Sequence, residues 1–215
     1  MGTYSTIVRF FQEGGIFMYP IMLVMAVGLA IAVERYIFLS RATSTNRRMW
    51  DQLMPALQSG KFPQAMSVTA KSEVAICKIL NYGLMRVKSA RRREDIEMAM
   101  EEGLMEIIPR LEKRTHYLAS FANIATLLGL LGTIIGLIQA FTAVANANPA
   151  EKAELLSSSI SVAMNTTAFG LIVAIPLLLV YSVLQSKTTQ IVDSLEMAAV
   201  KFLNMVTERS KPEAA

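Results

Sequence analysis

Hydroxyl and amide side chains interrupt two stretches of the sequence that are otherwise apolar. They include Thr126 and Thr133 in the first stretch, and Asn165, Thr166 and Thr167 in the second, SISVAMNTTAFGLIVAIP. Such groups can hydrogen-bond a neighbouring helix or organise water along a proton path. They cannot store a charge near neutral pH, and residues 117–150 and 155–186 contain no Asp, Glu, Lys, Arg or His. If protons cross here, the titrating acid must come from another chain.

Small residues accompany these hydroxyls at helical spacing. One face would carry Thr126, Gly129, Thr133, Gly136 and Ala140, and another Ser159, Ala163, Thr167, Gly170 and Ala174. Small residues let membrane helices approach closely, so tight packing is one interpretation, and a threonine-lined cavity or pore is the other. The candidate proton-path residues are Thr133, Thr167, Thr126, Thr166 and Asn165. The candidates for helix packing in the pore are Gly129, Gly132, Gly136, Gly170, Ala174 and Pro176.

Three long stretches without charged side chains predict the elements that hold these residues. A helix needs about 20 apolar residues to cross the hydrocarbon core, and the 215-residue chain is 53% hydrophobic and only 18% charged. We expect an all-α integral membrane protein with transmembrane helices at 16–39, 116–145 and 157–186. An amphipathic segment at 1–15, a helical region at 40–115, a loop at 146–156 and a C-terminal helix and tail at 187–215 complete the expected organisation.

Lys and Arg predict the orientation in the bilayer, because they are enriched in cytoplasmic segments. Residues 40–115 and 187–215 are rich in them, whereas residues 1–15 and 146–156 each contain one. We therefore expect the N-terminus and the 146–156 loop outside and the C-terminus in the cytoplasm. The basic clusters lack interleaved aromatic residues, which argues against nucleic-acid binding. No cleaved signal peptide is expected, and the single cysteine, Cys77, excludes an internal disulfide framework.

The region at 40–115 shows helix signals and little sign of enzymatic chemistry. Ser59-Gly60 should stop one helix and Pro63 should start the next. An apolar stripe should pack on the preceding helices: Ile96, Met100, Leu104, Ile107 and Leu111. We expect a kink at Pro109 in a helix that continues into the second span. The chain has no phosphate loop and no His/Cys cluster, so we expect no enzyme, no metal and no cofactor. The one histidine, His116, is expected at the membrane boundary.

Two motifs resemble the MotA/TolQ/ExbB proton-channel family: LLGLLGTIIG at 127–136 and NTTAFGLIVAIP at 165–176. FQEGG at 11–15, MYP at 18–20 and Glu34-Arg35 are also similar to the family, and the resemblance covers nearly the whole chain. Three spans resemble the ExbB/TolQ branch, because the flagellar MotA branch has four. One departure is Val162, where ExbB and TolQ commonly carry a glutamate.

The resemblance implies a homo-pentamer whose second and third spans line a central pore in a bacterial inner membrane. The pore would hold a dimer of an ExbD-like or TolR-like single-span partner, and the partner's membrane aspartate would take up and release protons. Thr133 and Thr167 match the family's pore threonines beside that aspartate. The work would pass to a TonB-like or TolA-like protein. An ExbB-like role in TonB-dependent transport is favoured; a TolQ-like subunit and a non-conducting scaffold remain open, as does Na⁺ as coupling ion.

Overall fold

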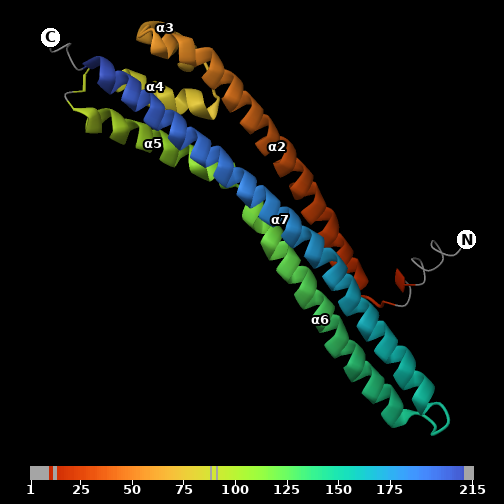
Figure 1. Cartoon of the computed structure of the whole chain (residues 1–215). Helices are drawn as coiled ribbons and strands as arrows, with labels where there is room; N and C mark the ends of the chain where they lie inside the picture. Colours follow the sequence, from red (N-terminus) through yellow and green to blue (C-terminus); the bar gives the residue numbers. More distant parts are fainter. Residues whose placement is uncertain (1–9, 12–13, 88, 91, 211–215) are drawn as a thin grey trace, which may run out of the picture. The chain divides into compact units, whose positions relative to one another are not determined.

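All regular secondary structure in the described part of the chain is helical. The computed structural model describes residues 10–11, 14–87, 89–90 and 92–210 (Figure 1). The helices are α2 (Met18–Gln58), α3 (Phe62–Thr69), α4 (Ala75–Val87), α5 (Arg93–Glu112), α6 (Thr115–Asn146) and α7 (Lys152–Ser210). The predicted all-α fold is therefore confirmed, and α7 continues without interruption from the third apolar stretch into the C-terminal region.

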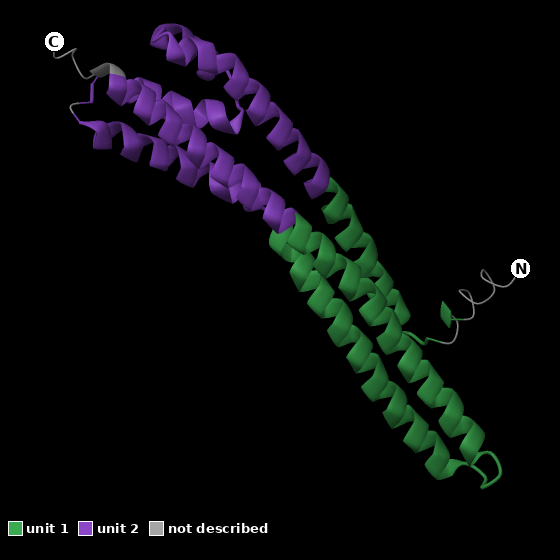
Figure 2. Ribbon diagram, viewed as in Figure 1, with its two compact units in different colours: residues 1–34, 114–183 green, residues 35–113, 184–215 purple. Residues whose placement is uncertain are grey.

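The chain divides into two compact units (Figure 2). Unit 1 comprises residues 1–34 and 114–183, and unit 2 comprises residues 35–113 and 184–215. Unit 1 contains the first part of α2, all of α6 and the first part of α7, and therefore all candidate site residues. Unit 2 contains α3, α4, α5 and the remaining parts of α2 and α7.

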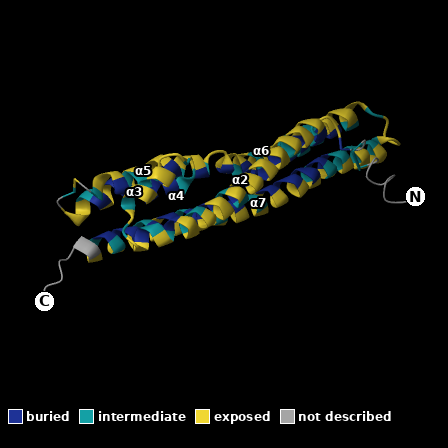
Figure 3. Ribbon diagram, turned by 90° about the horizontal axis from the view of Figure 1, so that it is seen from above, coloured by how far each residue is buried: buried dark blue, intermediate teal, exposed yellow. Residues whose placement is uncertain are grey.

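Among the residues that the structure describes, three helical segments are long and apolar enough to cross a membrane. They are α2, the run Arg93–Asn146 that ends with α6, and α7. Large apolar side chains stay exposed along them in unit 1, including Leu23, Ile138 and Leu179. Figure 3 shows exposed residues, in yellow, along α2, α6 and α7. A soluble protein seldom exposes so many apolar side chains, whereas a bilayer accommodates them. The predicted number of apolar helices is confirmed.

Unit 2 has an apolar core between its helices. The stripe predicted on α5 is confirmed, since Ile96, Met100, Ile107 and Leu111 are buried and Leu104 is half-buried. On α4, Gly83 brings the helix close to its neighbours: a Cβ there would lie 2.9 Å from both Met100 and Phe202. The predicted helix boundary at Ser59-Gly60 is also confirmed, because α2 ends at Gln58 and Gly60 has a left-handed φ of 73°.

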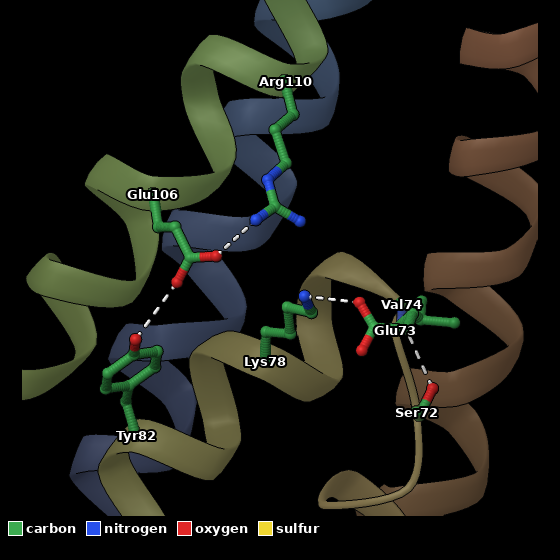
Figure 4. A network of polar contacts seen from close by, with 7 residues as sticks. All are labelled: Ser72, Glu73, Val74, Lys78, Tyr82, Glu106 and Arg110. Carbon is green, nitrogen blue, oxygen red and sulfur yellow. Dashed lines mark hydrogen bonds and ion pairs between the residues drawn. The ribbon is translucent and has the colours of Figure 1, made fainter.

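Polar contacts join the loop before α4 to that helix, and α4 to α5 (Figure 4). Lys78 pairs with Glu73 at 2.5 Å, and its hydrogen bond lowers the pKa of the Glu73 carboxyl below the ordinary value. Tyr82 donates a hydrogen bond of 3.1 Å to Glu106, which raises the pKa of the Tyr82 phenol. Glu106 also pairs with Arg110 at 2.6 Å. Because Glu73, Glu106 and Arg110 are exposed, the pairs fix geometry more than they stabilise the fold.

The expectation that one helix continues through Pro109 into the second span is wrong, because the helix breaks between α5 and α6. Pro109 lies inside α5, and the break follows it: α5 ends at Glu112, Arg114 has a φ of 67°, and α6 begins at Thr115. A left-handed residue interrupts the series of i to i+4 hydrogen bonds. The guanidinium of Arg35 instead donates to the Leu111 carbonyl oxygen, one of the last carbonyls of α5.

Candidate functional site

Glycines bring α6 and α7 into close contact within unit 1. A Cβ on Gly170 would lie 2.7 Å from the Ala125 carbonyl oxygen and 3.1 Å from the Gly129 Cα. A Cβ on Gly136 would lie 3.0 Å from that of Ala163. Backbones this close leave no room for larger side chains, and hydrogen bonds between the helices become possible. Gly129, Gly136 and Gly170 thus lie where α6 and α7 approach each other closely, as the predicted packing role requires.

Thr133 and Thr167 meet at this helix contact. Their hydroxyl oxygens are hydrogen-bonded to each other. The Thr167 Oγ1 also lies 3.0 Å from the Gly129 carbonyl oxygen. The Thr133 Oγ1 lies 3.3 Å from the carbonyl oxygens of both Gly129 and Ala163. We call these two side chains the threonine pair; both are partly buried.

The threonine pair has more acceptors than protons. Each hydroxyl has one proton to donate and can also accept. Thr133 has three acceptors within reach, namely two carbonyl oxygens and the Thr167 hydroxyl. Its O–H can therefore turn from one acceptor to another, and the pair can either donate a hydrogen bond to a carboxylate or accept one from a carboxylic acid. Such a group suits a site where a neighbouring acid changes its protonation state.

Thr166 lies against a different element from its neighbour Thr167. Its hydroxyl donates to the Gly14 carbonyl oxygen at 2.6 Å and lies 2.9 Å from the Val162 carbonyl oxygen. The side chain is buried, and its methyl group is the nearest neighbour of a Cβ built on Gly132. Sequence reasoning missed this contact; its one local signal was the Gly14-Gly15 pair, which allows a close backbone approach.

The remaining candidate residues lie outside the threonine pair. Thr126 is exposed, and its hydroxyl bonds to the Ala122 carbonyl oxygen of its own helix at 3.1 Å. Asn165 is half-buried, and its side chain makes no hydrogen bond to any other described residue. Ala174 is buried, whereas Pro176 is exposed within α7. The structure thus brings together Thr133 and Thr167 with the small residues around them, and leaves Thr126, Asn165 and Pro176 apart.

Comparisons with known proteins show which proteins the chain is similar to. Residues 71–197 match the model of the MotA/TolQ/ExbB proton channel family. A Methanothermobacter thermautotrophicus protein, provisionally named as a biopolymer transport protein ExbB homolog, is 27% identical over 90% of this chain and 68% of its own length. A Synechocystis protein provisionally named ExbB-like 1 is 31% identical over 85% of this chain and 72% of its own. The Tol-Pal system protein TolQ of Haemophilus influenzae is 33% identical over 43% of this chain and 40% of its own.

Proposed function

Because the chain belongs to the MotA/TolQ/ExbB proton channel family, we propose that it is the ExbB-like channel subunit of a proton-driven motor complex. Family membership and three apolar helices make it a multi-pass membrane protein with a transport-related role. The proposal adds a bacterial inner-membrane location, a pentameric ring, and TonB-dependent outer-membrane transport as the process served. The greater coverage by ExbB-type relatives favours this branch over a TolQ-like one.

The observation that carries the proposal is a threonine pair in apolar helix segments that lack acidic and basic side chains. Residues 117–150 and 155–186 contain no Asp, Glu, Lys, Arg or His, so the chain alone cannot hold a proton as charge there. We infer that an ExbD-like single-span partner supplies an aspartate. An acid in the middle of a membrane costs roughly 2.5–3.5 kcal/mol on insertion scales, and polar neighbours lower that cost.

The hydroxyls would serve the partner's acid in both of its states. A carboxylate can accept the Thr133 or Thr167 proton, and a carboxylic acid can donate to the same oxygen. Because Thr133 has alternative acceptors on α6 and α7, its O–H can change direction without leaving a polar group unpaired. The membrane potential supplies about 2.3 kcal/mol per charge per 100 mV for the transfer.

The proposed orientation follows from the basic residues. Residues 40–115 and 187–215 contain most of the Lys and Arg, which supports a cytoplasmic location for both segments. The N-terminus and residues 146–156 would face the periplasm. Protons would then pass the threonine pair between these two sides, and the work would reach a TonB-like protein through the partner.

Proton flux into liposomes under an imposed potential tests the proposed function. The chain alone is compared with its complex with the single-span, aspartate-bearing partner. We expect flux only in the complex and its loss in Thr167→Val, while Thr142→Val retains it. Among the described residues, the Thr142 hydroxyl bonds only to Ile138 of its own helix. A conducting Thr167→Val complex would remove the threonine pair from the path. An assembled wild-type complex without flux would favour a scaffold.

A further inference from the structure

The described residues before α2 lie against α7 through several contacts. We call Phe10, Phe11 and residues 14–17 the N-terminal strap. The ring of Phe11 lies 5.0 Å from the ring of Phe169 in an edge-to-face arrangement, and the ring of Phe10 lies 6.2 Å from it. Further along the strap, the Gly14 carbonyl oxygen accepts the Thr166 hydroxyl at 2.6 Å. A Cβ on Gly15 would lie 3.2 Å from the Val162 side chain.

The strap and α6 contact adjacent stripes of the same helix. The strap meets Val162, Thr166 and Phe169, which are spaced by four and three residues and so form one stripe of α7. The stripe Ala163, Thr167 and Gly170 faces α6. Each of the second set follows a member of the first by one residue. Two neighbours therefore restrict the rotation of α7 about its own axis at the level of the threonine pair.

Local features of the sequence make the strap possible. Gly15 has a left-handed φ of 71°, which other residues adopt only with strain, and it turns the chain into α2. Phe17 at the end of the strap lies near Gly132, where a Cβ would be 3.3 Å from that of Phe17. Thr166 is only 2% exposed, so its hydroxyl bond to Gly14 is shielded from competing groups.

We propose that Thr166 is a positioning residue, which holds the strap on α7 and thereby keeps Thr167 turned toward Thr133. This inference rests on the proposed function for its effect on flux, but not for the attachment of the strap. One residue corresponds to about 100° of helix rotation, so even a partial turn of α7 would separate the two hydroxyls of the threonine pair. The role differs from that of Thr167, whose hydroxyl lies in the pair itself.

Two measurements on the same variants test the positioning role. The variants are Thr166→Val, which keeps the side-chain shape without the donor, and Thr166→Ser, which restores it. We expect flux through the liposome-reconstituted complex to fall about three- to twentyfold in Thr166→Val, the range set by the average and the largest hydrogen bonds between membrane helices. Thr166→Ser should stay within about twofold of wild type. Thr142→Val is the matched control, because within the described part of the chain the Thr142 hydroxyl bonds only to its own helix.

Hydrogen exchange of the strap gives a second readout that is independent of conduction. Mass spectrometry of a peptide covering residues 14–21 follows the amides at the start of α2. Release of the strap should speed the exchange of these amides by about three- to twentyfold in Thr166→Val. Exchange should stay unchanged in Thr166→Ser and Thr142→Val. Because it needs no proton flux, this measurement tests whether Thr166 holds the strap on α7 independently of the proposed function.

The outcomes are distinguishable. Slower flux together with faster exchange in Thr166→Val, both reversed in Thr166→Ser, supports the positioning role. Unchanged flux or unchanged exchange in Thr166→Val overturns it. An inactive wild-type complex would defeat the proposed function, and with it the effect of Thr166 on conduction. If Thr166→Val does not assemble, Thr166→Ala decides: it removes the hydroxyl with a smaller side chain that fits the same space, so wild-type flux and exchange would overturn the proposal.

Discussion

The Thr167 hydroxyl of α7 lies 3.0 Å from the Gly129 carbonyl oxygen of α6 and bonds to it. In an α-helix that carbonyl also accepts the backbone N–H four residues later, which belongs to Thr133. The Gly129 carbonyl oxygen therefore accepts both a backbone hydrogen bond within α6 and the hydroxyl hydrogen bond from α7. Because the acceptor keeps its backbone partner when the hydroxyl is removed, the threonine pair can be altered without leaving a buried polar group unpaired.

The first prediction concerns the stability of the threonine pair. Thr133→Val and Thr167→Val should each cost less than about 1 kcal/mol of the free energy of unfolding in bicelles, because hydrogen bonds between membrane helices average about 0.6 kcal/mol. A double-mutant cycle should give a coupling of the same size, with an upper limit of about 1.7 kcal/mol. A loss of several kcal/mol in either variant would mean that the hydroxyls hold the helices together and that flux data on them are ambiguous.

The second prediction concerns the glycine contact. Gly170→Ala should lower the free energy of unfolding by about 1–3 kcal/mol, because the new methyl group meets backbone atoms that cannot move aside: Ala125 O at 2.7 Å and the Gly129 Cα at 3.1 Å. Gly28→Ala is the matched control. There the nearest atoms are the ends of the flexible Leu177 side chain, at 2.8 and 3.0 Å, so its cost should be smaller. Equal costs would contradict the close-approach interpretation.

The third prediction concerns Arg35, which is 3% exposed and donates to the Leu111 carbonyl oxygen near the end of α5. Hydrogen bonds from charged groups contribute about 1.5–3 kcal/mol, so Arg35→Met should lower the free energy of unfolding by about that amount. The change should also speed hydrogen exchange in the last turn of α5. Arg41→Met, at an exposed position on the same helix, should change neither quantity. A stable Arg35→Met variant would show that this carbonyl needs no side-chain donor.

The fourth prediction concerns pH and Cys77. Burial raises the pKa of the Cys77 thiol above its ordinary value of 9.0, partly offset by a hydrogen bond with Ser72. The unfolded chain then loses this proton at lower pH than the folded chain. The thiol's contribution to stability is complete below about pH 9 and declines as the pH rises through the folded value. The free energy of unfolding, measured from pH 8 to 10.5, should show this decline. In Cys77→Ala, the part of the decline that comes from the thiol should be absent.

Labelling of the same residue provides a check. Since Cys77 is the single cysteine and is buried, alkylation of the folded protein at pH 8 should be slow and should become fast on denaturation. Fast labelling of the folded protein would show that unit 2 opens readily around α4.

Periodicity was sufficient to predict the helices and the α5 stripe, because apolar residues at a 3.6-residue period and long charge-free runs are local signals. The end of α2 was equally local, since Gly60 takes a left-handed φ that favours glycine. The break between α5 and α6 was not predictable in this way. Arg114, a non-glycine residue, has the positive φ, and the Leu111 carbonyl is satisfied by Arg35, which is 76 residues away in sequence.

In the candidate site, too, local sequence signals predicted one part and contacts between distant residues determine the other. Spacing placed Thr133 and Thr167 on faces with small residues, and the structure brings these two hydroxyls together. Spacing could not assign Thr166, because its neighbour is the carbonyl oxygen of Gly14, 152 residues earlier. A backbone carbonyl has no signature in a sequence. The contact follows from the path of the chain before α2, which no periodic pattern records.

The consecutive hydroxyls of Thr166 and Thr167 also constrain how such chains can vary in length. Inserting or deleting one residue between Val162 and Gly170 would turn the following side chains by about 100°. The side chain that bonds to Gly14 would then face α6, or the side chain that bonds to α6 would face Gly14. We expect insertions and deletions to be absent from this interval among relatives with the same architecture. Length differences should collect instead between α6 and α7, at residues 147–151, where no helix register has to be kept.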